Sequence, residues 1–214
     1  MFYDVHTYHL PKASNIVSVI NYKSNMVFEE NVFYSIGTHP WRVAETDFSK
    51  DEWNVIFQYA SQKNIVAIGE CGLDKLHANM DCQKEIFARH IELANRLQKP
   101  LIVHCVQAFE QTIQLLKNTK VSVIIHGVNN KLEKLQPFLD CGYFLSFGAA
   151  LLKEKSVARK TLLSVPNTQL LLETDEADIP IATIYAEAAR LKNMSLEKIT
   201  LQLEQNVKQI FGWE

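Results

Sequence analysis

Six apolar runs in this chain end in a side chain that can bind a metal ion. FYDVH ends in His6, SIGTH in His39, IVAIGE in Glu70, PLIVH in His104, VSVIIH in His126 and LLLETD in Asp175. Imidazole and carboxylate groups are common ligands of borderline divalent cations such as zinc and manganese. If the ends of the strands meet on one face, these side chains would form a metal centre suited to hydrolysis.

Each of these residues alone has an ordinary structural explanation. A single histidine at the end of a strand is more often a hydrogen-bonded structural residue than a ligand. Glu70 could cap the turn that follows it, and Asp175 could belong to the N-cap of a helix near Ile181. The shared placement at strand ends is hard to explain by capping, so the whole set favours a metal site.

The strands that would carry these groups are short apolar runs. Most of them are apolar at nearly every position instead of alternating, which is typical of strands buried on both faces of a parallel sheet. The eight runs are Met1–His6, Asn15–Asn21, Val32–Thr38, Ile65–Glu70, Leu101–Cys105, Val121–His126, Tyr143–Phe147 and Gln169–Thr174.

Segments with apolar residues at helical spacing separate most of these runs. They are Phe48–Lys63, Cys82–Gln98, Ala108–Lys117, Leu132–Asp140, Ser156–Leu163, Ile181–Leu191 and a last helix that Ser195 opens. The alternation indicates an α/β fold, either a barrel or a doubly wound sheet, and eight strands favour a TIM-type (β/α) barrel. About ten residues lie between Asn21 and Val32, too few for a full crossover helix. We therefore expect a barrel shortened near the N-terminus.

The composition fits a single globular domain, residues 1–214, with 47% hydrophobic residues. Lys and Arg number 22 against 24 Asp and Glu, so binding to nucleic acid would need a local basic patch. The four cysteines lack C-x-x-C spacing, which favours reduced thiols and a cytoplasmic protein. The first residues do not resemble a signal peptide, and no apolar run approaches the roughly 20 residues of a membrane span.

The motifs together resemble those of the TatD-type metal-dependent hydrolases, also called TatD-related DNases. The similar stretches are SIGTHPW, VAIGECGLD, QKEIFARHIELANRLQKPLIVH, IIHGV, DCGYFLSFG, LLLETD and SLEKITLQLEQNVKQIFG, in the family's order from Val32 to Gly212. IGECGLD and LLLETD are the most specific of them. The resemblance implies a TIM barrel, one or two divalent ions (Zn, Mn or Mg), and phosphodiester hydrolysis by a metal-activated water.

The resemblance also implies roles for single residues. Glu70 is similar to the family's metal-bridging carboxylate, and His104 and His126 are similar to its paired histidine ligands. Asp175 is similar to the aspartate that binds metal and accepts the proton of the attacking water. His6 is similar to the first histidine of an N-terminal H-x-H motif. A bound cation lowers the pKa of its water from about 15.7 to about 7, which gives hydroxide at neutral pH.

The chain departs from the family pattern at several positions. Tyr8 stands where the second histidine of H-x-H is expected, and His9 follows it. A shift of one residue turns a side chain to the other face of a strand, so His9 can be a ligand only if the chain bulges or leaves the strand. Val106 replaces an arginine, and Gly127 and Val128 replace Cys-Phe after IIH. The lost arginine weakens the case for binding a phosphate.

Other residues near the predicted site have two interpretations each. His39 either positions a substrate or makes a hydrogen bond within its loop, and Asp74 either orients a metal ligand or is a turn residue. Trp41 and Arg42 could offer a stacking surface and a phosphate contact, or they could be ordinary exposed loop side chains. His77 is interpreted as a surface residue.

The sequence leaves three functions open. The leading one is phosphodiester hydrolysis on DNA or a related nucleic acid. The second is a metal-dependent ester, lactone or amide hydrolase of the same barrel, which the lost arginine and the slightly acidic composition favour. The third is a non-catalytic protein with a decayed metal site, although the retained Glu70, His104, His126 and Asp175 argue against it. We expect no membrane association, and the sequence gives no oligomeric state.

Overall fold

The computed structural model describes residues 1–23, 26–45 and 50–213. Two compact units are distinguished by their internal contacts. We call Met1–Ile20 together with Ile125–Glu214 the terminal unit, and Asn21–Ile124 the central unit.

The strands follow one another in the sheet in the order of the chain, from β1 to β8. Their bounds are β1 Phe2–Thr7, β2 Ile16–Asn21, β3 Phe33–Ile36, β4 Ile65–Asp74, β5 Leu101–Val106, β6 Val123–Ile125, β7 Phe144–Phe147 and β8 Leu170–Leu172. The pairs β1–β2, β3–β4, β4–β5 and β7–β8 are parallel. All eight predicted runs therefore become strands, with bounds that differ by a few residues.

The first strand also pairs with the chain that follows the last one. Thr7 forms a parallel bridge with Asp175, and the Asp175 N–H donates to His6 O at 2.9 Å. The first and last strands are thus neighbours within the terminal unit, as in a sheet that closes into a barrel.

Helices follow most strands, as the sequence predicted. Their bounds are α1 Pro40–Glu45, α2 Lys50–Ala60, α3 Met80–Leu97, α4 Phe109–Leu116, α5 Leu132–Asp140, α6 Val157–Ser164, α7 Ile181–Leu191 and α8 Leu196–Phe211, with 3-10 turns at Ala149–Leu152 and Asn167–Gln169. Ser195 is the N-cap of α8, since its side chain accepts from the Lys198 N–H. The short helix α1 was not predicted.

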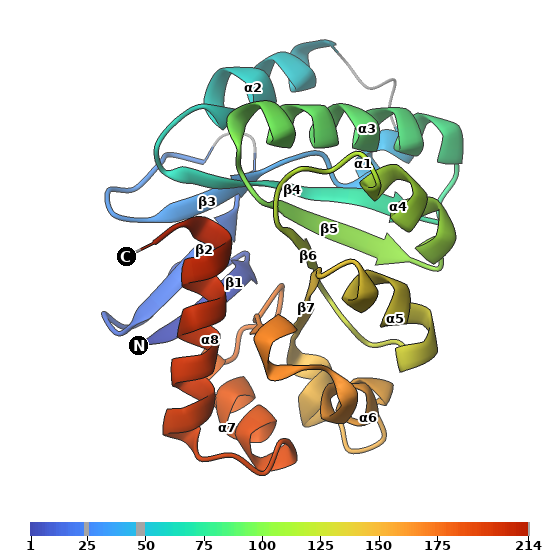
Figure 1. Cartoon of the computed structure of the whole chain (residues 1–214). Helices are drawn as coiled ribbons and strands as arrows, with labels where there is room; N and C mark the ends of the chain where they lie inside the picture. The colour runs from blue at the N-terminus through green and yellow to red at the C-terminus, as the bar shows by residue number, and fades with distance from the viewer. Residues whose placement is uncertain (24–25, 46–49, 214) are drawn as a thin grey trace. The chain divides into compact units, whose positions relative to one another are not determined.

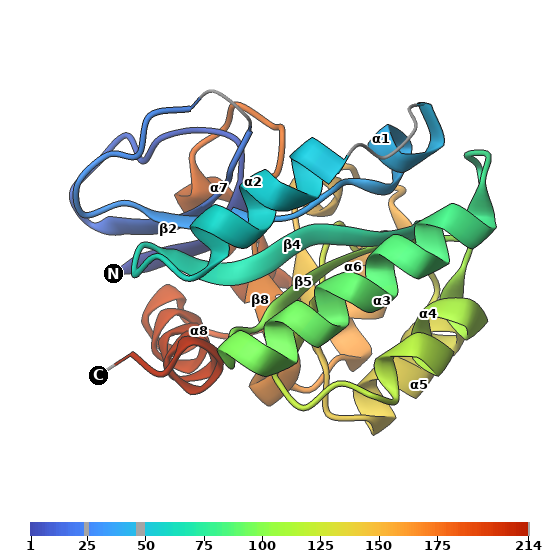
Figure 2. The ribbon, with the colours of Figure 1, turned by 90° about the horizontal axis from the view of Figure 1, so that it is seen from above.

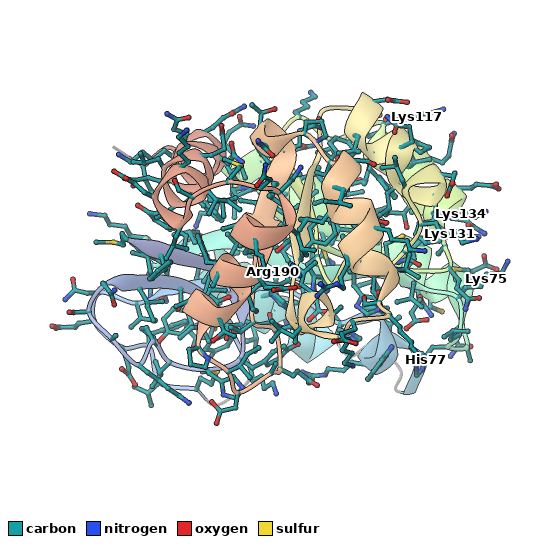
Figure 3. All side chains as sticks on the ribbon, turned by 90° about the horizontal axis from the view of Figure 1, so that it is seen from below. Lys75, His77, Lys117, Lys131, Lys134 and Arg190 are labelled. Carbon is teal, nitrogen blue, oxygen red and sulfur yellow. The ribbon has the colours of Figure 1, made fainter. Side chains whose placement is uncertain are left out.

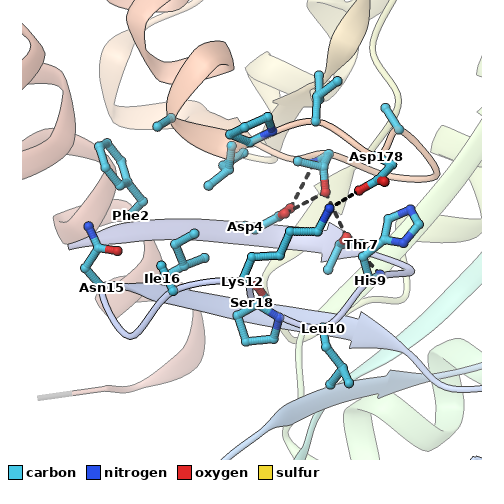
Figure 4. A pocket seen from close by; sticks show the side chains of 18 residues that line it. Phe2, Asp4, Thr7, His9, Leu10, Lys12, Asn15, Ile16, Ser18 and Asp178 are labelled. Carbon is cyan, nitrogen blue, oxygen red and sulfur yellow. Dashed lines mark hydrogen bonds and ion pairs between the residues drawn. The ribbon is translucent and has the colours of Figure 1, made fainter.

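The described residues between β2 and β3 contain no helix, which confirms the predicted gap after Asn21. The connection from β1 to β2 also lacks a helix, and none of the predicted helical segments falls there. This loop leaves a mainly apolar pocket of about 280 Å³ in the terminal unit. Figure 4 shows Lys12 reaching across it to pair with Asp178. The pocket is near the lower end of the usual size of a small-molecule site.

Strand β4 and helix α3 form the core of the central unit. Five side chains of β4 are fully buried: Ile65, Ala67, Ile68, Cys71 and Leu73. Helix α3 lies along β4 in two views of the ribbon (Figures 1 and 2), and Ile86, Phe87, Leu93 and Ala94 are among its buried residues. Burying an apolar side chain of this size stabilises the fold by about 1.5–3 kcal/mol, so this packing holds β4 in place.

Helices α7 and α8 pack on β1 and β8 in the terminal unit (Figure 1). The buried hydroxyl of Tyr185 donates to Tyr3 O at 3.0 Å and accepts from the Tyr3 N–H at 3.1 Å. Asn206 on α8 donates to Leu170 O at 2.8 Å. These bonds satisfy backbone groups that would otherwise be buried without partners.

Some predicted ligands do not lie at the end of a strand. Glu70 lies inside β4, which continues to Asp74, whereas Asp175 lies beyond the end of β8. A Cβ atom at Gly72 would meet the His104 carbonyl oxygen at 2.0 Å, so only glycine allows β4 to approach β5 here. No helix within the described residues is long and apolar enough to cross a membrane.

Candidate metal centre

Glu70, His39 and His104 form a tight group in the central unit, which we call the Glu70 cluster together with Asp74. Nδ1 of His104 lies 2.9 Å from Glu70 Oε1, and Nε2 of His39 lies 3.1 Å from the same oxygen. One ligand atom from each of the three residues lies within 4.8 Å of the others. The sequence prediction that Glu70 and His104 lie together agrees with this geometry.

The hydrogen bonds of His39 indicate which nitrogen carries its proton. The Trp41 N–H donates to His39 Nδ1 at 3.2 Å, so Nδ1 is the unprotonated nitrogen. The proton of a neutral ring then lies on Nε2, which faces Glu70. His39 is therefore arranged to donate a hydrogen bond to Glu70. His39 therefore contacts Glu70 in addition to the hydrogen bond within its own loop.

His104 connects Glu70 to a second carboxylate. Its Nδ1 faces Glu70, and its Nε2 lies 3.3 Å from Asp74 Oδ2. Histidine ligands of metals usually donate their other ring N–H to a carboxylate, which fixes the tautomer and the ring plane. Asp74 occupies that position for His104.

Asp74 is held by several hydrogen bonds. Burial raises the pKa of this carboxyl, but hydrogen bonds from Trp41 Nε1, the Leu76 N–H and His104 outweigh burial and bring the pKa below its usual range. The Gln83 side chain also forms two hydrogen bonds with the Asp74 backbone. It accepts from the Asp74 N–H at 2.8 Å and donates to the Asp74 carbonyl at 3.1 Å. Asp74 is therefore an ionised and fixed acceptor at neutral pH.

A buried amide fixes Glu70 from the other side. Asn21 Nδ2 donates to Glu70 Oε2 at 3.3 Å, and Asn21 Oδ1 accepts from the Glu70 N–H at 3.2 Å. Asn21 was not predicted as a site residue. Its position at the end of a strand was the only available signal.

The terminal unit contains a second group, His6, His126, Glu173 and Asp175, which we call the Asp175 cluster. The ring centroids of His6 and His126 are 4.4 Å apart, and His6 Nε2 lies 3.6 Å from Asp175 Oδ1. Ligand atoms of His126, Glu173 and Asp175 lie within 4.8 Å of one another. The structure thus brings the predicted residues of this unit together.

Burial separates Asp175 from its neighbours. The side chain of His6 is fully buried, whereas that of Asp175 is 39% exposed. Asp175 also has a positive φ of 54°, which is uncommon for a residue other than glycine. It does not cap α7, because Pro180 is the N-cap residue of that helix. The alternative that LLLETD is an N-cap signal is therefore wrong.

Glu173 is a member of this cluster that the sequence analysis missed. The side chain is fully buried, and its Oε1 accepts from the Gly127 N–H at 2.7 Å and lies 3.5 Å from His126 Nδ1. Among the described residues, Glu173 Oε2 has no hydrogen-bond partner. The motif LLLETD contains Glu173, but strand alternation could not tell which carboxylate faces His126.

Asp4 forms hydrogen bonds with Thr174, the residue that precedes Asp175. Its two carboxylate oxygens accept from the Thr174 N–H at 2.9 Å and from Thr174 Oγ1 at 2.6 Å. Burial raises the pKa of Asp4 to about 7, although these hydrogen bonds act in the opposite direction. Figure 4 shows these bonds on the floor of the pocket next to β1. They hold the segment that carries Asp175.

Tyr8 and His9 have different surroundings. The Tyr8 ring lies edge-on against His6, with centroids 5.6 Å apart. His9 turns away, and its Nε2 lies 3.1 Å from Glu176 O. In this structure Tyr8, and not His9, has the place expected for the second histidine of H-x-H.

Comparisons with known proteins identify the family of this chain. The family described as TatD related DNase matches residues 10–212. The chain belongs to this family. An uncharacterized metal-dependent hydrolase of Buchnera aphidicola is 30% identical over 201 residues, which cover 85% of this chain and 75% of that protein. A protein of Pantoea ananatis named 3'-5' ssDNA/RNA exonuclease TatD is 28% identical, covering 82% of this chain and 76% of its own.

Solved structures of family members share the fold. YjjV, a TatD homologue from Escherichia coli, superposes with a TM-score of 0.80 at 20% identity, covering 99% of this chain and 98% of its own. A TatD family hydrolase from Entamoeba histolytica gives a TM-score of 0.78 at 14% identity, covering 100% and 98%. The predicted TIM-type barrel is confirmed, and the chain is a metal-dependent hydrolase of the TatD family.

The side chains present fit a divalent cation. Both clusters offer imidazole nitrogen and carboxylate oxygen atoms within 4.8 Å of one another. Mixed nitrogen and oxygen donors suit zinc and manganese better than magnesium, which prefers oxygen. The buried Glu173 Oε2, with no hydrogen-bond partner among the described residues, also fits a nearby positive charge.

Proposed function

We propose that this hydrolase cleaves phosphodiester bonds of single-stranded nucleic acid. Asp175 carries the proposal, because its carboxylate is 39% exposed while its histidine neighbours are buried. An exposed carboxylate among buried ligands can meet a water molecule and a substrate. The name of the Pantoea relative, which includes both DNA and RNA, supports this substrate class.

We assign the metal ligands as Glu70 and His104 in the Glu70 cluster and His6, His126 and Asp175 in the Asp175 cluster. A divalent cation bound by these residues in either cluster would polarise the scissile phosphodiester and lower the pKa of a water. Asp175 accepts the proton of the attacking water through its exposed carboxylate oxygen. Asp74 holds the ring of His104 through Nε2, and His39 donates to Glu70. Zinc or manganese is the expected cation, bound as one or two ions.

A second candidate is the hydrolysis of an ester, a lactone or an amide. Val106 favours it, since the family resemblance implies an arginine at this position and arginine is the usual bidentate reader of phosphate. A net charge of −2 also gives no general attraction for nucleic acid.

The test is a comparison of metals and substrates. The chain is stripped with a chelator, reloaded with Zn²⁺, Mn²⁺ or Mg²⁺, and offered a labelled single-stranded oligonucleotide, the matching duplex, and p-nitrophenyl acetate. We expect shortening of the single strand with Zn²⁺ or Mn²⁺ and little turnover of the ester. Faster turnover of the ester would support the second candidate. No turnover of any substrate would support the decayed site instead.

The cellular location is part of the same proposal. The four cysteines, Cys71, Cys82, Cys105 and Cys141, are free thiols, which fits the reducing cytoplasm. Fractionation of cells with an antibody to the chain would test this location.

A further inference from the structure

Trp41 is a large aromatic side chain that remains exposed beside the Glu70 cluster. It lies in the first turn of α1, two residues after His39, and is 47% exposed. The His77 ring stacks on it, with centroids 4.8 Å apart and an angle of 26° between the planes. Figure 3 shows His77 at the surface of the molecule. Two stacked aromatic rings that are both partly exposed offer an outer ring face on which a planar ligand can pack.

The indole ring is fixed in place. Trp41 Nε1 donates to Asp74 Oδ2 at 2.6 Å, and Asp74 itself is 2% exposed. His77 Nε2 lies 3.9 Å from the same Asp74 oxygen. A ring held by a buried carboxylate loses little further freedom when a ligand packs on it, which favours binding.

The same carboxylate connects the aromatic pair to the candidate metal ligands. Asp74 Oδ2 also lies 3.3 Å from His104 Nε2. The ring centroids of Trp41 and His104 are 6.3 Å apart, and those of Trp41 and His39 are 4.8 Å apart. The Trp41 ring therefore lies next to the histidine rings of the Glu70 cluster. A base stacked on Trp41 would be separated from the cluster by a distance similar to that between a base and its own phosphate.

We propose that Trp41 and His77 form a nucleobase subsite, on which one unpaired base of the substrate stacks while its phosphate meets the Glu70 cluster. This inference rests on the proposed nuclease function. Stacking on an aromatic ring tolerates every base, since each has a π-face. The subsite thus gives preference for single strands without preference for sequence, because a base inside a duplex is already stacked and paired.

If Trp41 only holds Asp74 in place, substitutions of Trp41 should affect activity differently. Trp41→Phe keeps an aromatic face but loses the N–H bond to Asp74, whereas Trp41→Leu loses both. If the base stacks on Trp41, the Phe variant keeps most of its activity on nucleotides and the Leu variant does not. If the role is only to hold Asp74, both variants lose activity to a similar extent on every substrate.

The kinetic test uses two phosphodiesters with the same leaving group, p-nitrophenyl thymidine 5'-phosphate and methyl p-nitrophenyl phosphate. Trp41→Leu also removes the bond to Asp74 and so lowers kcat/KM for both esters, but the loss for the nucleotide ester should exceed the loss for the methyl ester on the order of tenfold, mainly through KM. Phe57→Leu is the matched control, since Phe57 is 51% exposed on α2 of the same unit. Equal losses on the two esters, or no loss, would overturn the subsite.

A binding test separates this proposal from the proposed reaction. The anisotropy of a labelled oligothymidylate is measured against the metal-loaded chain carrying Asp175→Asn, which needs no turnover. Adding Trp41→Leu should weaken binding on the order of tenfold, and adding His77→Ala should weaken it less. Unchanged affinity would refute the subsite even if wild type cleaves DNA. Loss of affinity would support the subsite even if wild type cleaves nothing.

Discussion

At the scale of single residues, Asp74 connects most of the groups in the Glu70 cluster. Its carboxylate accepts from Trp41 Nε1 and the Leu76 N–H and lies within 3.3 Å of His104 Nε2. A carboxylate with this many donors stays ionised well into acid. The ring plane of His104 therefore depends on a residue outside the set of proposed ligands.

The first prediction concerns the proton acceptor. Asp175→Asn keeps the shape and one ligand oxygen but removes most of the basicity, so the rate should fall by about 10²–10⁴. Metal content should fall less, because Glu70, His104 and His126 remain. Hydrolysis and metal content are measured in parallel, with Asp178→Asn as control, since Asp178 is an exposed carboxylate that pairs with Lys12. Unchanged turnover with metal retained would exclude Asp175 as the base.

The second prediction concerns His90, which is buried in α3. Its Nε2 accepts from the Thr38 N–H and its Nδ1 faces Ile86 O, and burial lowers the pKa of the ring from 6.5 to about 4. The unfolded chain thus binds a proton more readily, so stability is complete above pH 6.5 and is lost as the pH falls towards 4. The loss should be about 3 kcal/mol.

Urea unfolding of wild type and His90→Gln between pH 7.5 and pH 4 measures this effect. Glutamine can still donate and accept but does not titrate, so the variant should lose less stability over this range. Parallel pH curves for the two proteins would show that His90 does not titrate as described.

Some site residues could be predicted from sequence and others could not, for a geometric reason. His104 and Glu70 lie within strands, where a polar residue in an apolar run is conspicuous. Glu173 and Asp175 follow the end of β8, and Asp175 has a positive φ. Strand alternation does not hold there, so the sequence could not assign Glu173 to His126.

At the scale of elements, the pairing of β1 with the segment after β8 places Tyr8 beside His6. The Asp175 N–H donates to His6 O at 2.9 Å and the Tyr8 N–H donates to Asp175 O at 3.2 Å. This hydrogen-bond ladder pairs β1 with Asp175 on both sides, at His6 and at Tyr8. The ring of Tyr8 lies against the ring of His6. A phenol, with an ordinary pKa of about 10, is a poor ligand beside an imidazole at neutral pH.

The third prediction follows from that ladder. Tyr8→His should restore the H-x-H motif and increase the affinity for Zn²⁺ on the order of tenfold, or about 1.4 kcal/mol. Calorimetric titration of the stripped protein with Zn²⁺ measures this change. Tyr8→Phe is the control and should bind metal like wild type. Weaker binding by Tyr8→Phe would mean that the phenol oxygen is itself a ligand.

Element positions were predictable because buried parallel strands are apolar on both faces. Helices α5 and α7 have the predicted bounds, Leu132–Asp140 and Ile181–Leu191. None of the predicted helical segments falls between β1 and β2, and the structure has a loop there. The short helix α1 was missed because its six residues are too few to show a helical period.

At the scale of the whole molecule, the family and the barrel could be predicted because several motifs occur in order along the chain. The division into two compact units was not visible in the sequence, which has no linker or change of composition. The single domain of residues 1–214 stays a prediction, and it implies one cooperative unfolding transition.

The fourth prediction concerns metal removal. Cations that bind only the folded state stabilise it by RT ln(1 + [L]/Kd), about 2.7 kcal/mol at a hundredfold excess over Kd. For a chain of this size the melting temperature should rise by about 5–10 °C with Zn²⁺ and fall again with a chelator. Differential scanning fluorimetry measures the shift.

Two variants test whether the shift in melting temperature depends on the proposed ligands. The double variant His104→Ala and His126→Ala should lose the shift, whereas Lys12→Ala, whose partner Asp178 lies at the surface, should keep it. A wild-type melting temperature that does not respond to metal would argue against the proposed ligands.

The hydrogen bonds between Asp4 and Thr174 have a consequence for the timing of synthesis. They join residues that are 170 positions apart, and the bridge from Thr7 to Asp175 spans a similar length. The ribosome makes β1 first, and the segment that pairs with it follows only some 170 residues later. Contacts between residues so far apart in the sequence form slowly. During synthesis β1 therefore remains without this partner until the segment around Asp175 has been made, and only then can the proposed cation find His6 and Asp175 side by side.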